Sequence, residues 1–600
     1  MATFGFKKKQ KQIVGEMRKS KITTSAGCGA LVDFPGFSGL IGGQNLWNPK
    51  FSSEMKIQEK TLEDFLNKEF FVQVAAETDK EFYKNAYSIP ILRFPEMYYC
   101  PDCYELDYAS RLARNYQQDN QQMKPLECNH CGKTLLPSRF IVGCGKGHLN
   151  EFPYDWWVHR NKKDRCENPK LKIYNTASSG GLESLMVECE TCKAKQSMAN
   201  VLSKETMSSL KCRGGLPWLG KGKKCECESG IRAMMRGSNN VYYPDTVSAL
   251  TIPPWSSAVQ KMIEDKMETF QDFISSLIDG DDRSMFDRAI KNFFQKKNIQ
   301  EEYDCSYEEF VNEINMRFFG EKEISDKNDI LYNEYKALVG PDKNDPYFKT
   351  ETEEVPDYIK EYIDCVKLVK RLREVQVLRG FRRIEMEGKE RLEYASMSTK
   401  PEKWLPAVEL LGEGIFIKLS RERVKTWLEE NKFSYEELHA RYDREHFGTI
   451  RGEKFSPVTV LVHTFSHLLM RELSFASGYD ASSIKEKIYV STDEDQWMCG
   501  VLLYTASANS DGSLGGLVRQ GKIEYLMDTI ISMLEKAEWC SNDPVCMESE
   551  GQGWAALNIA ACHACCLVPE ISCQYNNCLL DRNAVVGEGL DGRSKGYFVQ

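Results

Sequence analysis

The chain has 600 residues, of which 42% are hydrophobic and 28% are charged, a composition that excludes wholesale disorder and a collagen-like chain. This length is more than one hydrophobic core usually organises, so we expect several domains. The formal net charge of −9 argues against a protein that coats nucleic acid non-specifically. Any contact with nucleic acid must therefore come from local basic patches.

The N-terminal region, residues 1–97, begins with a basic arm. Its first 21 residues hold seven Lys and Arg residues against one acid, and the glycine-rich sequence SAGCGALVDFPGFSGLIGG follows. No apolar segment follows the lysines, so no secretory signal is expected. No apolar run approaches the roughly 18 residues of a membrane span. We therefore expect a cytoplasmic protein with no membrane partner.

Cysteine is the unusual residue of this chain. There are 22 cysteines, and without an export signal they are expected to be reduced and to bind metal rather than form disulfides. Random placement would give about 0.8 pairs three residues apart, whereas the sequence contains four such pairs. We expect Zn²⁺ as the cofactor, in two to three structural sites.

Residues 98–255 form a predicted zinc-ribbon region. Its sharpest motif is Cys-x2-Cys-x24-Cys-x2-Cys, and two such turns can supply the four thiolates of a structural zinc site. A second site is expected from a later Cys-x2-Cys pair, from one further cysteine and from either member of a Cys-x-Cys doublet, of which we slightly prefer the first. The predicted ligands are Cys100, Cys103, Cys128 and Cys131 for the first site, and Cys189, Cys192, Cys212 and Cys225 (or Cys227) for the second.

Three further residues of this region could belong to another centre. Cys144, His148 and Cys166 are of suitable types, but no complete set of four ligands is evident. Packed or free side chains are an equal alternative for them.

Residues 256–404 are predicted to be a helical middle domain, because apolar residues recur at three- and four-residue steps in sequences such as VQKMIEDKMETFQDFISSLI. Its most basic stretch is KRLREVQVLRGFRR, residues 370–383. This stretch fits a solvated helix with local ion pairs and a nucleic-acid patch equally well. The candidate DNA-binding residues are Arg371, Arg373, Arg379, Arg382 and Arg383.

Residues 405–600 alternate predicted strands and helices, which favours an α/β domain. VELLGEGIFIKL, KIYVS and GVLLYTAS are typical of strands, and IEYLMDTIISMLEKAE of a helix. Ser456-Pro457 predicts the start of another helix and Gly478 its end. Ser483 and Glu486 fit a capping box of a short helix. The predicted fold class is thus α/β multidomain, with a Cys-rich N-terminal region, a helical middle and a C-terminal α/β zinc-binding domain.

The C-terminal cysteines predict a further zinc site. Its ligands are Cys540, Cys546, Cys562 and Cys565, with Cys573 as a substitute for one of them. Sites with four thiolates are closed and leave no position for an activated water molecule. These sites are therefore expected to support the fold rather than catalysis.

A histidine pair lies on the helix predicted after Ser456. His463 and His467 share one helical face, but Thr464 occupies the position where the HExxH metalloprotease motif requires Glu. A packed or hydrogen-bonded pair, a stripe facing a partner or phosphate, and a catalytic metal site with Glu472 all remain open. The sequence contains no phosphate-binding P-loop, no G-x-S-x-G elbow and no dinucleotide fingerprint. We expect a non-enzyme without a small-molecule substrate.

Several stretches carry a family resemblance. GCGKGHLNEFPYDWWVHR, MRGSNNVYYPDTVSALTIPPW and LLGEGIFIKL resemble blocks of the DrmB family, core subunits of the bacterial DISARM anti-phage system. The stretch from HTFSHLLMREL to CHACCLVPEISCQYNNCLLDR is similar to the MrfA-like zinc-binding domain. Cys28 departs from the proline expected in the glycine-rich opening, which leaves the turn geometry there open.

The resemblance implies a non-motor accessory subunit that restricts phage DNA beside a separate helicase subunit resembling DrmA. ATP hydrolysis would belong to that partner, and the complex would bind or gate DNA. The cysteines from Cys540 to Cys565 match the zinc-binding domain, those from Cys100 to Cys131 match the N-terminal ribbon, and no catalytic residue transfers. Two alternatives stay open: a metal-dependent nuclease using His463 and His467, and a scaffold that contacts only protein.

Overall fold

The computed structural model describes residues 14–47, 55–74, 89–116, 125–162, 166–176, 180–278, 283–320, 324, 326–384, 394–445, 453–507, 515–587 and 594–598. The lysines of the basic arm at residues 7–11 lie outside them. The chain forms two compact units, and each collects segments that are distant in sequence. The first comprises Met1–Ile57, Glu69–Val247 and Gln376–Val408, and the second Gln58–Lys68, Ser248–Val375 and Glu409–Gln600.

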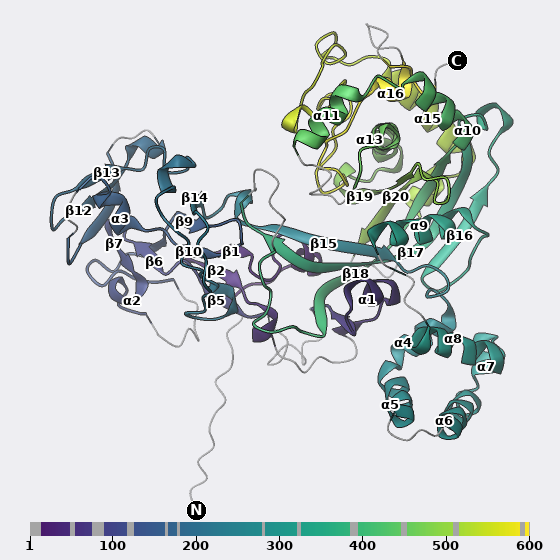
Figure 1. Ribbon diagram of the computed structural model, residues 1–600, viewed down its shortest axis with the longest axis horizontal. Helices are drawn as coiled ribbons and strands as arrows, with labels where there is room; N and C mark the ends of the chain where they lie inside the picture. The colour runs from purple at the N-terminus through teal and green to yellow at the C-terminus, as the bar shows by residue number, and fades with distance from the viewer. Residues whose placement is uncertain are drawn as a thin grey trace, which may run out of the picture. The chain divides into compact units, whose positions relative to one another are not determined.

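The first unit is built from short antiparallel strands (Figure 1). One three-stranded sheet has the order β1-β2-β5, another the order β10-β9-β14, and a six-stranded sheet the order β13-β12-β11-β7-β6-β8. The strands are β1 (Leu31–Phe34), β2 (Phe37–Ile41), β5 (Ile91–Arg93), β6 (Met97–Tyr99), β7 (Glu105–Tyr108), β8 (Leu136–Pro137), β9 (Phe140–Gly143), β10 (Leu149–Glu151), β11 (Leu171–Asn175), β12 (Leu185–Cys189), β13 (Lys195–Ser197) and β14 (Arg232–Met235).

Two short helices, α2 (Ala109–Leu112) and α3 (Tyr154–His159), accompany these sheets. The main core of this unit surrounds Phe140, Phe152 and Trp157, which are buried. Strands of two to five residues bury little apolar surface each, so this unit needs further cross-links between its turns.

The second unit contains the helical middle of the chain. Its helices are α1 (Lys60–Leu66), α4 (Ala258–Asp265), α5 (Met267–Ile278), α6 (Arg283–Lys296), α7 (Ile299–Tyr303), α8 (Tyr307–Phe319) and α9 (Lys327–Val339). A phenylalanine-rich core that includes Phe270, Phe294 and Phe310 joins α4 to α8. The helices end at Val339, and strands follow it, so the helical character is shorter than the sequence predicted.

The remainder of the second unit packs helices against long strands. β16 (Phe348–Glu353) pairs with β17 (Ile363–Arg382), and β18 (Trp404–Leu419) pairs with β20 (Met498–Ser507), which pairs with β19 (Ile484–Ser491). Figure 1 shows α13 (Pro457–Ser477) end-on, surrounded by the other elements. The other helices are α10 (Arg421–Glu430), α11 (Glu436–Arg444), α14 (Gly516–Gln520), α15 (Ile523–Ala537) and α16 (Asn583–Val586).

The chain passes between the units within β15 (Tyr243–Leu250), β17 and β18. The strands β3 (Lys56–Ile57) and β4 (Phe70–Val72) belong to the first unit, where β4 runs parallel to the start of β18. The four-domain division at residues 97, 255 and 404 stays a prediction. The mixed α/β class with a Cys-rich N-terminal region and a helical middle is confirmed.

The helix start predicted at Ser456-Pro457 and the helix end predicted at Gly478 are both confirmed in α13. The Ser456 hydroxyl accepts the backbone N–H of Val458, Pro457 is the first helical residue, and Gly478 ends the helix in a left-handed conformation. Two other predictions are wrong. Residues 370–382 are part of strand β17 rather than of a helix, and apolar residues such as Val375 and Val377 are buried along it. Glu486 is likewise in strand β19 and not in a capping box.

Among the helices that the structure describes, none is both long and apolar enough to cross a membrane.

Candidate metal centres

The first predicted tetrad comes together. Cys100 and Cys103 lie at the turn between β6 and β7, and all four sulfurs of Cys100, Cys103, Cys128 and Cys131 lie within 4.8 Å of one another. The sulfurs of Cys100 and Cys131 are 3.5 Å apart. The backbone N–H of Cys103 points to the sulfur of Cys100 at 3.3 Å, as in thiolate turns that bind a metal. This cluster fits a closed tetrahedral zinc site.

The second predicted set is divided between two clusters, which corrects the grouping. Cys189 and Cys192 meet His159 and Cys166, whereas Cys212 meets Cys144, His148 and Cys227. The strands decide this division, since Cys189 ends β12, next to α3, which carries His159, while Cys144 follows β9. The incomplete third centre of the sequence thus supplies ligands to both clusters.

Cys225 lies beside its cluster rather than in it. The Nδ1 atom of His148 faces the sulfur of Cys144 at 3.3 Å, and Nε2, on the other side of the ring, is 2.9 Å from the sulfur of Cys225. Cys227 is the member of the doublet within 4.8 Å of the other donor atoms. The preference for Cys225 over Cys227 is therefore wrong for this geometry, and Cys225 positions the imidazole from outside.

Sequence reasoning missed His159. Its Nδ1–H donates to the backbone carbonyl and the carboxylate of Asp155, both at 2.8 Å, so Nε2 faces the sulfur of Cys192 at 3.2 Å. An imidazole held in this way presents its free lone pair to a metal. Six residues separate His159 from Cys166, and this spacing is wider than the Cys-x2-Cys signal.

The electrostatics of these clusters favour a cation. Contact with the sulfur of Cys131, together with burial, raises the pKa of the Cys103 thiol to about 12. In the same way Cys192 and burial raise the pKa of Cys166 to about 12. The same clusters lower the pKa of Cys131, and that of Cys192 to about 6, so one thiolate of each pair is favoured while its neighbour keeps a proton. A divalent cation at the centre would allow the remaining thiols to ionise and release their protons.

The C-terminal tetrad also comes together. The sulfurs of Cys540 and Cys562 are 3.6 Å apart and those of Cys546 and Cys565 are 3.8 Å apart, whereas Cys573 is not in this cluster. An ion pair between the buried Arg582 and the half-buried Asp543 braces the first loop. The guanidinium of Arg582 reaches both carboxylate oxygens of Asp543 at 2.7 and 2.8 Å, and this carboxylate accepts the backbone N–H of Cys540.

His463 and His467 point into the interior and not to solvent. Both side chains are fully buried, and their ring nitrogens meet Glu486 and Cys573. Glu472, proposed as their partner, instead pairs with Lys536 at 2.5 Å. A substrate-accessible site at this pair would require the packed helix α13 to open.

Two of the five candidate DNA-binding arginines are buried. Arg373 pairs with Glu409 at 2.5 Å and with Glu264 at 3.3 Å. Arg383 donates to the backbone carbonyls of Gly147, Val241 and Gly29, and no ion pair is found for it among the described residues. Buried cations of this kind hold strands together and cannot reach a phosphate.

The other three arginines are at least partly accessible. Arg379 pairs with Asp245, Arg382 lies over the ring of Tyr394, and Arg371 is exposed, with its guanidinium 3.4 Å from the carbonyl of Pro346. Arg371 is thus the exposed member of the set for which the structure gives no acidic partner among the described residues, whereas Arg382 is only half-exposed.

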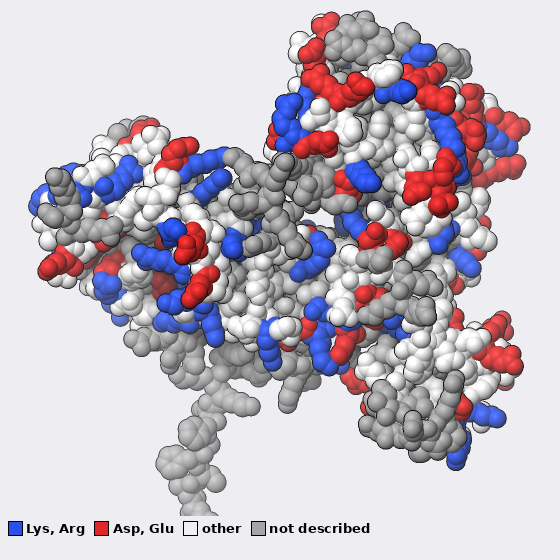
Figure 2. All heavy atoms as spheres, viewed as in Figure 1, with Lys and Arg blue, Asp and Glu red and all other residues white. Residues whose placement is uncertain are grey.

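A group of exposed basic side chains lies in the loop that follows Cys212. Arg213, Lys221, Lys223 and Lys224 are exposed, and no ion pair joins them to an acid among the residues that the structure describes. They lie on a hairpin closed by the hydrogen bond from Cys225 N–H to the Gly214 carbonyl. We call residues 213–224 the basic hairpin. Figure 2 shows Lys and Arg over the first unit, and Asp and Glu gathered over the part of the second unit that carries α10 and α11.

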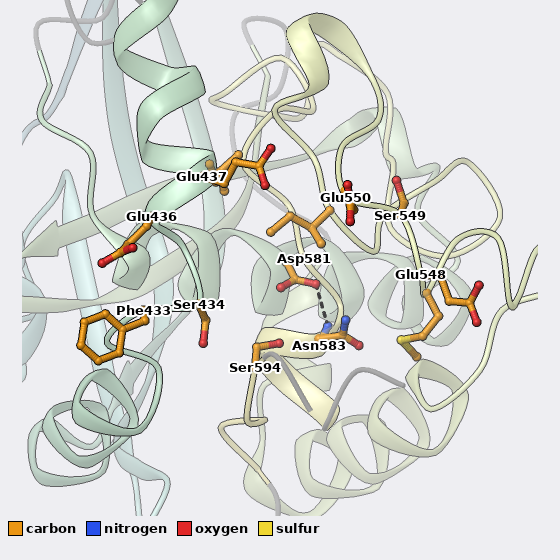
Figure 3. A pocket seen from close by; sticks show the side chains of 13 residues that line it. Phe433, Ser434, Glu436, Glu437, Glu548, Ser549, Glu550, Asp581, Asn583 and Ser594 are labelled. Carbon is orange, nitrogen blue, oxygen red and sulfur yellow. Dashed lines mark hydrogen bonds between the residues drawn. The ribbon is translucent and has the colours of Figure 1, made fainter. Parts of the chain in front are cut away.

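The second unit has a pocket of about 630 Å³ beside α11, drawn in Figure 3. Its polar lining is acidic and includes Glu436, Glu437, Glu548 and Asp581. The buried Asp581 accepts the hydroxyl of Tyr435 at 3.1 Å. An acidic wall repels phosphate, so this pocket is unsuited to a nucleotide or DNA backbone.

Comparison with known proteins agrees with these features. A family model described as a domain of unknown function (DUF8724) matches residues 18–243, which contain the first three clusters, and the MrfA Zn-binding domain matches residues 465–566. The DISARM protein DrmB of Bacillus paralicheniformis (strain ATCC 9945a / NCIMB 11709 / CD-2) is 33% identical over 562 residues, which cover 90% of this chain and 95% of that protein. The chain belongs to the DrmB family of DISARM proteins.

The DrmB family assignment confirms the resemblance seen in the sequence, including the C-terminal zinc-binding domain. The matched MrfA segment contains Cys540, Cys546, Cys562 and Cys565, and it ends before Cys573. The match to a zinc-binding domain supports zinc as the metal of the C-terminal tetrad, and the donor sets of sulfur and imidazole nitrogen in the other clusters fit zinc as well.

Proposed function

We propose that this DrmB-family chain is a non-motor accessory subunit of a DISARM anti-phage complex. It pairs with a helicase subunit resembling DrmA and helps to bind or gate phage DNA. Membership of the family supports the place in DISARM. The missing P-loop supports leaving ATP hydrolysis to the partner.

The observation that carries the proposal is the set of four Cys-rich clusters, each of which is complete with four donors. Closed sites of this type hold loops in place and leave no open position for chemistry. In the first unit three of them join turns between short strands that pack on a shared apolar core. The protein thereby presents rigid loops to its partners.

The basic hairpin supports contact with DNA. It carries four exposed cationic side chains, although the chain as a whole has a negative net charge. The cluster that contains Cys212 and Cys227 anchors the loop that bears them. Lysine and arginine side chains on a fixed loop contact phosphates without reading sequence. We therefore move the proposed DNA contact from the buried Arg373 and Arg383 to this hairpin, together with Arg371.

The test compares the helicase subunit alone with the helicase subunit plus this chain. DNA affinity is measured by fluorescence anisotropy over a range of salt concentrations, and ATP hydrolysis is measured with and without DNA. We expect the added chain to tighten DNA binding and to change DNA-stimulated hydrolysis. Unchanged affinity and unchanged hydrolysis would remove the proposal.

The same samples address the two alternatives. A nuclease at His463 and His467 predicts cleavage of labelled DNA with Mg²⁺ or Mn²⁺, lost in His463→Ala, although the burial of both imidazoles argues against it. A scaffold that contacts only protein predicts that charge reversal in the basic hairpin leaves DNA binding by the complex unchanged.

A further inference from the structure

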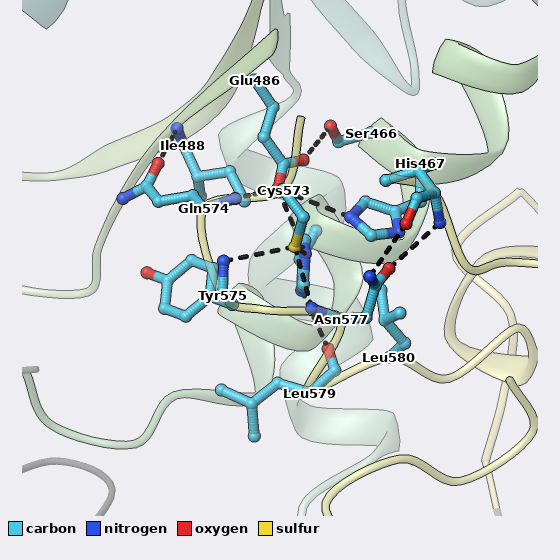
Figure 4. Close-up of polar contacts among 12 residues, drawn as sticks. Ser466, His467, Glu486, Ile488, Cys573, Gln574, Tyr575, Asn577, Leu579 and Leu580 are labelled. Carbon is cyan, nitrogen blue, oxygen red and sulfur yellow. Dashed lines mark hydrogen bonds and ion pairs between the residues drawn. The ribbon is translucent and has the colours of Figure 1, made fainter. Parts of the chain in front are cut away.

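Four buried side chains from distant parts of the second unit meet at one point, and Figure 4 labels three of them, His467, Glu486 and Cys573. The four are His463 and His467 of α13, Glu486 of β19 and Cys573 of the C-terminal loop, and their donor atoms lie within 4.8 Å of one another. All four belong to residues that are less than a tenth exposed. This group is separate from the tetrad of Cys540, and Cys573 lies beyond the segment matched by the MrfA domain.

The two imidazoles turn lone pairs toward the centre. Nδ1 of His467 is 3.0 Å from the carbonyl oxygen of Cys566, and Nδ1 of His463 is 3.4 Å from that of Leu579. A carbonyl oxygen only accepts, so both Nδ1 atoms carry hydrogen, and in the neutral rings Nε2 is an acceptor. Nε2 of His467 is buried and has no hydrogen-bond partner.

The other two side chains receive hydrogen-bond donors from the surrounding chain. The sulfur of Cys573 receives two backbone N–H groups, from Tyr575 at 3.3 Å and from Asn577 at 3.1 Å. One oxygen of Glu486 accepts the N–H of Gln574 at 2.8 Å, and the other accepts the hydroxyl of Ser466. Donors aimed at sulfur and carboxylate stabilise their charged forms.

Four acceptors therefore face one another at short range. Nε2 of His463 lies 3.2 Å from the sulfur of Cys573 and 3.2 Å from Glu486, and Nε2 of His467 lies 3.5 Å from the same carboxylate oxygen. Protonating both rings would place two cations with ring centroids only 4.3 Å apart.

We propose that His463, His467, Glu486 and Cys573 bind a divalent metal ion of the zinc type. Two neutral imidazoles, one thiolate and one carboxylate carry two negative charges, which a divalent cation balances. Bonds of roughly 2.0–2.3 Å to a tetrahedral zinc place neighbouring donors about 3.3–3.8 Å apart, close to the contacts seen here. The ion would tie α13, β19 and the C-terminal loop together in the dry interior.

The test counts metal in the purified full-length chain by elemental analysis. We expect Cys573→Ala to contain one metal equivalent less than the unmodified chain. Cys578→Ala removes a buried thiol of the same loop that is in none of the clusters found among the described residues, and it should lose no metal. Cys573→Asp keeps an anionic donor and should retain the ion. Equal metal content in the unmodified chain and in Cys573→Ala would overturn the proposal.

A second measurement needs no variant and so does not depend on folding of Cys573→Ala. The four Cys-rich clusters contain two histidines in total, while the proposed site adds two histidines and one carboxylate. X-ray absorption of the zinc-loaded chain should therefore show about one nitrogen or oxygen ligand per metal. About half of that value would overturn the proposal. Neither measurement involves DNA or the helicase.

Discussion

The Nη2 atom of Arg383 lies 2.6 Å from the carbonyl oxygen of Gly29, which is 354 residues earlier in the chain. The same guanidinium donates to the carbonyls of Val241 at 2.6 Å and Gly147 at 3.0 Å. This buried cation thus closes three loops of the first unit onto the end of β17. It has no carboxylate partner among the residues that the structure describes, so its role is to satisfy the backbone.

Replacing this arginine should destabilise the protein. Arg383→Ala leaves three buried carbonyls without donors, and we expect a loss of about 3–5 kcal/mol in the free energy of unfolding of the first unit. Thermal unfolding measures it, with Arg371→Ala as the control because that guanidinium is exposed. Equal melting temperatures for the two variants would contradict the structural role of Arg383.

Charge reversal in the basic hairpin should weaken DNA binding by the complex. Lys221, Lys223 and Lys224 changed together to Glu should lower affinity at least about tenfold and reduce the slope of log K against log salt by about 2–3, since each phosphate contact contributes about 0.9. The matched control reverses three exposed lysines in and just after α6, Lys291, Lys296 and Lys297. If both triple variants lose affinity equally, the effect is one of net charge and not of this hairpin.

The new grouping of the cysteines can be tested by a double variant. Cys189 and Cys212 belong to different clusters in the structure, whereas the sequence placed them in one site. Elemental analysis of Cys189→Ala/Cys212→Ala should therefore show the loss of two metal equivalents, and each single variant the loss of one. A loss of only one metal equivalent in the double variant would instead indicate that Cys189 and Cys212 bind the same metal ion. Cys225→Ala should lose none.

The first and last cysteine tetrads and the caps of α13 could be predicted from the sequence, because they depend on residues that are close together in the chain. The tetrad of Cys100 needs two turns with the same spacing, and Ser456 needs only the next residues. The partners of Cys189 and Cys212 depend instead on which strands pair, and His159 enters from α3. Glu486 had the spacing of a helix cap, but the pairing of β19 with β20 made it a strand residue facing the histidines.

The burial of arginines was equally hidden in the sequence. A run of basic residues among valines and leucines fits a solvated helix as well as a strand. In the 20-residue strand β17 the side chains alternate between faces, so Arg373 reaches Glu264 and Glu409 inside the second unit. Those acids stand far from the arginine in sequence, and nothing in the local pattern identifies them as partners.

Asp581 should make stability fall as pH rises. Burial raises the pKa of this carboxyl from 3.8 to about 6, so the folded state holds its proton more tightly than the unfolded state does. The resulting stabilisation is complete below pH 3.8 and is lost as pH rises through 6. Asp581→Asn carries no titrating group, so between pH 5 and 7.5 the unmodified chain should lose about 1 kcal/mol relative to this variant. Paired thermal unfolding curves at both pH values measure the difference. A constant difference would mean that Asp581 ionises as readily in the folded chain as in the unfolded one.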